Sequence, residues 1–371
     1  MVGLLAFSLI RNDQNAIGFS SWSAASSIGF AVALLPGAYW AVRGMLGRPD
    51  PEARIFPRTW LLIALLLPLT LAIGHAAFRS EALAGQVVVG PLAHIGTSLI
   101  AAALVLGLIL RGEGQLSLKD VSLFLTVGLT VIPLLAIVAE GMVLLPAGVL
   151  GAAWLVSTSE GLELIQTLMS AGADPTAISP ALVAEWMQRP AIVAAVFAFT
   201  AGIVPPIEEV AKTAAVWPSM RRGLSPRRAF VVGALAGAGY GLFEALFLSQ
   251  PGPEWLSTAI GRLGATFMHS ATAGITSWGL MEWARDRRWM RALGAYAVSV
   301  LSHAIWNVAA LSAGYEALVR ETSAPAQAPA PTAITALSTA VLIGLSLASV
   351  FLLARGIPAD SPHPESPSSG A

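Results

Sequence analysis

Long apolar stretches dominate the hydrophobic pattern of this chain and recur along most of its length. A hydrocarbon core about 30 Å thick is crossed by roughly 20 apolar residues in a helix. Nine stretches have about this length, at residues 23–43, 59–78, 87–110, 121–150, 190–217, 229–249, 258–282, 292–314 and 332–354. The pattern therefore predicts an all-α protein, a polytopic membrane helix bundle with about nine transmembrane helices.

The basic residues predict how these helices are oriented. Fifteen of the 21 Lys and Arg residues fall in alternate connections and in the C-terminal tail, five fall on the opposite side, and Lys212 lies within a span. Connections on the cytoplasmic side of a membrane carry the excess of Lys and Arg. The alternation predicts an N-terminus outside and a C-terminus inside.

Composition supports a membrane protein and narrows its chemistry. Hydrophobic residues make up 56% of the chain and charged residues 11%, against about 25% charged in soluble domains. The net charge is zero, which argues against a nucleic-acid partner, and the lipid bilayer is the expected surrounding. The chain has no cysteine, which excludes disulfides, thiolate nucleophiles and Cys-bound metals.

The chain divides into five predicted segments. These are four N-terminal transmembrane helices over 1–155, an extracytoplasmic loop or interfacial helix over 156–189, a four-helix core over 190–314, a Pro/Ala linker with the ninth helix over 315–355, and a disordered Pro/Ser-rich tail over 356–371.

Ionisable residues inside membrane spans are costly and indicate a functional site. Here they concentrate in the fifth to eighth spans. Three pairs are spaced four residues apart, so each pair shares one side of a helix: Glu208 with Lys212, Tyr240 with Glu244, and His303 with Asn307. His269 lies near the middle of the seventh span. Because lipid exposure would be costly, we expect these groups to converge on one buried site.

Two local features are expected to shape that site. Pro205 and Pro206 carry no N–H, so carbonyls about one turn earlier lose their partners, and the resulting kink should place Glu208 and Glu209 in the first turn of a new helix. Glycines at 233, 237, 239 and 241 give the sixth span a smooth face. That face should allow close packing and bring Glu244 near the fifth span.

These residue types suit the activation of a water molecule. A glutamate can take a proton from water, a histidine or asparagine can donate to the developing oxyanion, and a second carboxylic acid can protonate the leaving amine. Alternatively, two histidines and a glutamate can hold a metal that acidifies the water. The sequence has no HExxH motif, so the signal for a metal is weaker.

Four short motifs resemble those of the PrsW-type intramembrane proteases, within the wider superfamily of CAAX proteases and bacteriocin-processing proteins. They are "EEVAK" at 208–212, "YGLFE" at 240–244, "HSAT" at 269–272 and "HAIWN" at 303–307. Their order on four consecutive spans also agrees, over about residues 200–310. The chain departs from the family pattern at Tyr240, where Phe is usual, and at Ala245, where Asn is frequent.

The resemblance implies an endopeptidase in a bacterial cell membrane that cleaves membrane-anchored proteins such as anti-sigma factors. It implies a catalytic set of Glu208, Glu209, Glu244, His269, His303 and Asn307, with Lys212 and Tyr240 in support. Glu208 is the preferred general base because it shares a face with Lys212. No cofactor is needed if the mechanism depends on glutamate, whereas a Zn²⁺ mechanism would place the ion on Glu244, His269 and His303.

Other interpretations remain open from the sequence alone. Broken helices and buried carboxylates also occur in ion-coupled transporters, although the polar residues here crowd into one half of the chain instead of repeating in both. A non-catalytic scaffold of the same fold would be expected to lose some of the motif residues. A peptidase for prenylated C-termini would be favoured by a histidine at position 244. Each buried pair could also be a structural contact between helices.

Overall fold

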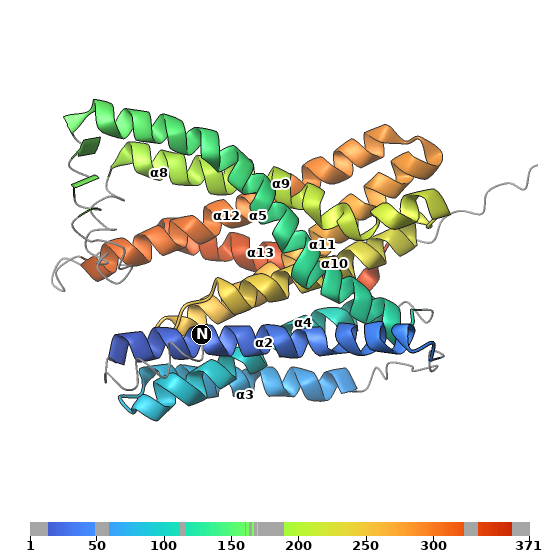
Figure 1. Ribbon diagram of the computed structural model, residues 1–371, viewed down its shortest axis with the longest axis horizontal. Helices are drawn as coiled ribbons and strands as arrows, with labels where there is room; N and C mark the ends of the chain where they lie inside the picture. The colour runs from blue at the N-terminus through green and yellow to red at the C-terminus, as the bar shows by residue number, and fades with distance from the viewer. Residues whose placement is uncertain are drawn as a thin grey trace, which may run out of the picture. The chain divides into compact units, whose positions relative to one another are not determined.

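The computed structural model describes residues 14–48, 59–111, 116–159, 189–322 and 333–357, together with a few positions between 161 and 169. Helices make up nearly all of this part of the chain, and it contains no strand. The first helices are α2 (Gln14–Met45), α3 (Thr59–Arg79), the π-helix η1 (Gly85–Val89), α4 (Gly90–Leu110) and α5 (Leu118–Ser157) (Figure 1). The all-α prediction is confirmed.

The second half of the chain begins with a helix that is broken several times. It consists of α8 (Pro190–Phe197), the π-helix η3 (Ala198–Ile203), α9 (Val204–Lys212), and the 3₁₀ segments η4 (Thr213–Ala215) and η5 (Trp217–Arg222). Four long helices follow: α10 (Pro226–Phe247), α11 (Trp255–Asp286), α12 (Trp289–Thr322) and α13 (Ala333–Arg355).

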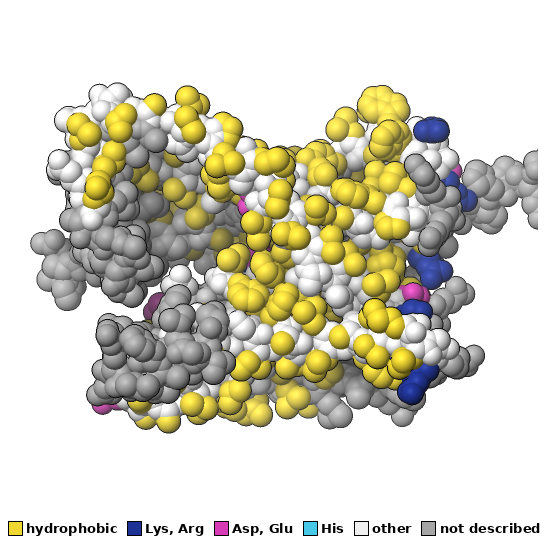
Figure 2. All heavy atoms as spheres, viewed as in Figure 1, with side chains coloured by type: hydrophobic (Ala, Val, Ile, Leu, Met, Phe, Trp, Pro, Cys, Tyr) yellow, Lys and Arg dark blue, Asp and Glu magenta, His cyan; other side chains and the backbone are white. Residues whose placement is uncertain are grey.

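Seven helices in the described residues are long and apolar enough to cross a membrane. They correspond to seven of the nine predicted spans. Of the other two, α3 contributes only the shorter apolar stretch Leu65–Arg79, and α11 is long but rich in Ser, Thr and Gly. Figure 2 shows hydrophobic side chains over most of the visible face, with Lys and Arg at helix ends. The chain is thus a multi-pass membrane protein, and the count of nine and the orientation stay predictions.

Contacts divide the chain into two compact units. Unit 1 comprises Met1–Pro133, Lys212–Ser299 and Ser346–Ala371, and unit 2 comprises Leu134–Ala211 and Val300–Leu345. The boundaries fall inside α5, α9, α12 and α13, so they do not follow the predicted segments. Most of the predicted loop 156–189, the linker at 323–332 and nearly all of the tail 356–371 lie outside the described residues.

The pair α10 and α11 forms the centre of unit 1. A Cβ added at Gly237 would lie 2.8 Å from the Cα of Ser270, and one added at Gly241 would lie 2.7 Å from the Cα of Thr266. Only glycine permits this approach. The prediction of close packing is confirmed: Gly237 and Gly241 face α11, the seventh predicted span, and Gly239 faces α5. The fifth predicted span is also near α10, since the Lys212 nitrogen lies 4.8 Å from the ring centroid of Tyr240.

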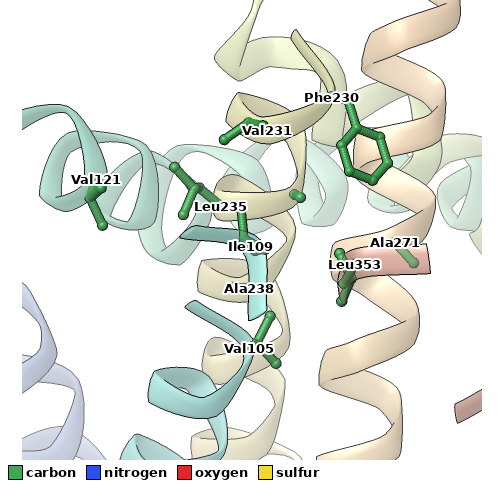
Figure 3. Packing of buried hydrophobic residues seen from close by; sticks show 10 residues of the cluster. Val105, Ile109, Val121, Phe230, Val231, Leu235, Ala238, Ala271 and Leu353 are labelled. Atoms are coloured by element: carbon green, nitrogen blue, oxygen red, sulfur yellow. The ribbon is translucent and has the colours of Figure 1, made fainter. Parts of the chain in front are cut away.

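A hydrophobic cluster holds α10 and α11 against the other helices of unit 1. Its buried residues come from α4, α5, α10, α11 and α13, and Figure 3 labels nine of them: Val105, Ile109, Val121, Phe230, Val231, Leu235, Ala238, Ala271 and Leu353. Several of these side chains are small, which suits helices that pack closely.

His94 connects α4 to the turn between α10 and α11. Its Nε2 lies 3.4 Å from the carbonyl oxygen of Leu246, and Trp255 Nε1 donates to its Nδ1 at 3.4 Å. The ring of Trp22 stacks on the imidazole. The Leu246 carbonyl belongs to the last turn of α10, where carbonyls have no partner within the helix. His94 is therefore a packing residue of unit 1.

Candidate functional site

The break in the fifth predicted span originates at its two prolines. The N–H of Val204 reaches back five residues to the carbonyl of Phe199, which is the π-helical pattern of η3. Pro205 and Pro206 then open α9 without donors of their own. Because α9 begins at Val204, Glu208 and Glu209 lie in its second turn. The expectation of a first-turn position was wrong, and the helix dipole contributes less there than predicted.

Unit 2 brings together three of the predicted residues: Glu208, Glu209 and His303. All three side chains are buried. The Nδ1 of His303 lies 3.0 Å from an oxygen of Glu209, and its Nε2 lies 3.8 Å from an oxygen of Glu208. One imidazole from α12 is therefore placed between two consecutive carboxylates of α9.

The two carboxylates are placed differently around the imidazole. The distance of 3.0 Å is a hydrogen bond, in which the Nδ1–H of His303 donates to Glu209 and fixes the orientation of the ring. In the neutral ring this leaves a lone pair on Nε2. The distance of 3.8 Å is too long for a hydrogen bond. Nε2 and the Glu208 carboxylate are thus spaced to share a small third group, such as a water.

Asn307 lies one turn after His303 on α12. Its side-chain amide donates to the carbonyl of Thr200 in η3 at 2.7 Å, also within unit 2. The resemblance places Asn307 in the catalytic set, and that role stays a prediction. In the structure its amide has a backbone partner.

Unit 1 brings together the remaining predicted residues in a chain of polar contacts. The Lys212 ammonium lies 2.8 Å from Nδ1 of His269, and Nε2 of His269 lies 2.9 Å from Oε2 of Glu244. Arg262 donates to the same oxygen at 3.0 Å. Tyr240 lies beside this chain of contacts. Its ring centroid is 4.8 Å from the Lys212 nitrogen and 5.2 Å from the ring centroid of His269.

The chemistry of Lys212 fixes the tautomer of His269. An ammonium can only donate, so Nδ1 of His269 accepts and Nε2 carries the hydrogen that is donated to Glu244. Both ring nitrogens are thereby used. A single oxygen of Glu244 accepts hydrogen bonds from the imidazole of His269 and from the guanidinium of Arg262.

Arg262 contacts Glu244 but is not among the site residues predicted from the sequence. A signal was present, because Arg262 lies seven residues before His269, and that spacing returns to the same face of a helix after two turns. The prediction that all the polar residues form one site stays a prediction, since each unit holds its own cluster.

The residues of unit 2 fit a divalent metal. Neutral imidazole nitrogen and carboxylate oxygen are ligands of zinc, and a histidine that binds metal usually donates its other N–H to a carboxylate. His303 has this arrangement, with Glu209 behind the ring and Glu208 near Nε2. In unit 1, both nitrogens of His269 already have partners. Glu208 and His303 therefore fit a metal, and the predicted ligand set of Glu244, His269 and His303 stays a prediction.

Comparison with known proteins assigns the chain to a family. The model of the PrsW family of intramembrane metalloproteases matches residues 143–343, more than half of the chain. No curated protein and no solved structure matches the chain. The match extends beyond the four motifs, from α5 to α13. With buried glutamates and histidines on membrane-spanning helices, the chain is a membrane-embedded protease, and it belongs to the PrsW family of intramembrane metalloproteases.

Proposed function

We propose that the protein hydrolyses peptide bonds of membrane-anchored proteins with a water activated between Glu208 and His303. The observation that carries this proposal is the buried imidazole between two carboxylates, one within hydrogen-bonding distance and the other 3.8 Å away. Both carboxylates lie in an apolar segment long enough to span a membrane. A scissile bond within or beside the bilayer would meet a water molecule at these carboxylates, whereas the apolar remainder of the span excludes water.

Each residue of unit 2 has a distinct task in this reaction. Glu208 takes a proton from the water as the water oxygen bonds to the peptide carbonyl carbon. The same proton passes to the amide nitrogen as the C–N bond breaks, which releases an amine and a carboxylic acid. His303 holds the water through Nε2, and Glu209 keeps the ring oriented through Nδ1. A divalent ion bound by Glu208 and His303 would acidify the water and polarise the carbonyl.

The substrates we propose are proteins with a single membrane anchor, of the kind that anti-sigma factors represent. Support comes from the family resemblance and from the location of the two glutamates in a membrane span. A soluble peptide would have no means of reaching a carboxylate at that position except through a water-filled opening.

The experiment is the cleavage of a panel of single-span membrane proteins by the purified enzyme in detergent. Glu208→Gln and His303→Gln keep the side-chain size but remove the base or its partner, so we expect rates to fall by about 10²-fold or more. Glu254→Gln is the matched control, because Glu254 is exposed at the start of α11. Each variant is assayed with and without a chelator.

The outcomes separate the alternatives. Loss of cleavage in the Glu208 and His303 variants, with Glu254→Gln active and all variants folded, supports the proposal. Sensitivity to the chelator that is restored by Zn²⁺ assigns the metal mechanism, and insensitivity assigns the glutamate mechanism. Wild-type rates in Glu208→Gln would overturn the assignment of the base.

A further inference from the structure

The π-helix η3 has carbonyls whose regular partners are missing, and that of Thr200 is one of them. Val204 donates to the carbonyl of Phe199, five residues back, and the next donor in this register would be residue 205 to Thr200. Residue 205 is proline, which has no N–H. In the α-helical register the donor to Thr200 would be Val204, and that N–H already goes to Phe199. Thr200 therefore needs a donor from elsewhere.

Asn307 supplies that donor. Its side-chain nitrogen lies 2.7 Å from the Thr200 oxygen, although the two residues are 107 positions apart in the chain. Asn307 is half-buried. A carbonyl within the bilayer core that has no donor is strongly disfavoured, because lipid offers no replacement. The amide thus takes the place of the backbone N–H that Pro205 removes.

The same helix makes a second contact to the broken segment. His303, one turn before Asn307 on α12, binds Glu209 in the second turn of α9 at 3.0 Å. Asn307 binds Thr200, before the break. The two contacts hold the segment on both sides of the prolines, so together they fix how α9 is rotated against α12. That rotation decides which carboxylate reaches Nδ1 and which lies near Nε2.

We propose that Asn307 is a positioning residue that replaces the missing N–H of Pro205, and that it acts on the reaction by holding Glu208 and Glu209 in register with His303. This inference rests on the proposed function only for the roles of those two glutamates. A role as donor to the substrate carbonyl is the alternative, and the two differ in how they depend on Pro205.

The test is a double-mutant cycle in purified full-length protein, read by hydrogen exchange over residues 199–209. Asn307→Ala leaves Thr200 without its donor, so we expect exchange in this segment to become about tenfold faster. Pro205→Ala restores an N–H that can pair with Thr200. In that background, Asn307→Ala should change exchange by less than about twofold, since the bond it removes is no longer needed.

Two variants sharpen the cycle. Pro206→Ala is the matched control, because its restored N–H would pair with Ala201 or Gly202 and should leave the tenfold effect intact. Asn307→Asp keeps the size of the side chain and removes the N–H donor, so it should speed up exchange as Asn307→Ala does. It provides the test if the Asn307→Ala protein does not fold. For each background, kcat and KM are measured on the single-span protein that the wild type cleaves best.

A fall in kcat for Asn307→Ala that shrinks in the Pro205→Ala background, with KM unchanged, supports positioning. An equal fall in kcat in the wild-type, Pro205→Ala and Pro206→Ala backgrounds would overturn it. No change in exchange on introducing Asn307→Ala into the wild type would overturn it as well. The exchange measurement requires no cleavage. If Glu208→Gln were active, the proposed function would fail while the exchange ratios would still decide the role of Asn307.

Discussion

At the scale of single residues, helices are joined by contacts that run from Arg262 through Glu244 and His269 to Lys212. Such contacts cost free energy of desolvation. Each charged group loses hydration on burial, and apolar residues of similar volume often replace buried ion pairs without loss of stability. The arrangement is tolerated because each polar group has a partner: Glu244 lies between two donors, and His269 between a donor and an acceptor. Removal of one member takes a contact away from another buried member.

This network predicts strong coupling between residues that do not touch each other. We expect Lys212→Met and Glu244→Gln each to lower the free energy of unfolding by about 3–5 kcal/mol, because each removes one charge from a buried network and leaves the opposite charge uncompensated. The loss in the double variant should be smaller than the sum of the two single losses by about 0.5–3 kcal/mol, since both substitutions act through His269. Chemical unfolding in detergent measures the cycle, and strictly additive losses would contradict a connected network.

At the scale of elements, the close contact between α10 and α11 sets the distance between Glu244 and His269. Gly237 lies against the backbone of α11 at His269 and Ser270. The charged contact therefore depends on a glycine that makes no polar interaction itself. Interfaces between membrane helices depend on such small residues, because apolar side chains gain little by leaving lipid for protein.

Gly237→Ala should separate the two helices and weaken the contact between His269 and Glu244. We expect a loss of about 1–3 kcal/mol in the free energy of unfolding, with a matching loss of peptidase activity. Gly261→Ala is the control, since Gly261 lies within α11 and an added Cβ there meets nothing within 4 Å. It should be neutral or stabilise by up to about 1 kcal/mol. Equal effects at both glycines would rule out a packing role.

At the scale of the whole molecule, the alternation of basic residues makes a prediction about orientation. The chain has no cysteine, so single cysteines can be introduced without background. Met45 follows the first span and is exposed, and Gln250 follows the sixth and is also exposed. We expect a membrane-impermeant maleimide added to intact cells to label Gln250→Cys and to leave Met45→Cys unlabelled until the cells are opened.

Labelling of both variants after permeabilisation is the control for accessibility. The reverse pattern in intact cells would invert the whole orientation, whereas labelling of both from outside would show that the number of crossings between the two positions differs from the prediction.

Much of the fold and of the site could be predicted from sequence, because the signals are local. Burial in lipid demands runs of about 20 apolar residues, so spans appear directly in the chain. Glu208, Glu209, Lys212, Glu244, His269, His303 and Asn307 were found because ionisable or strongly polar groups are rare in such runs. The proline pair predicted a break in the helix and carbonyls without partners. These conclusions need only the period of a helix and the cost of charge in lipid.

The tertiary structure alone decided which group contacts which. Nothing in the spacing shows that Glu209 binds His303 at one nitrogen, that Arg262 joins Glu244, or that Asn307 donates to a backbone carbonyl 107 positions away. The glycine face of α10 was visible in sequence, but its partner helix was not. Periodicity fixes the face on which a side chain lies, whereas the neighbour of that face depends on how distant helices pack, which requires contacts between segments far apart in the chain.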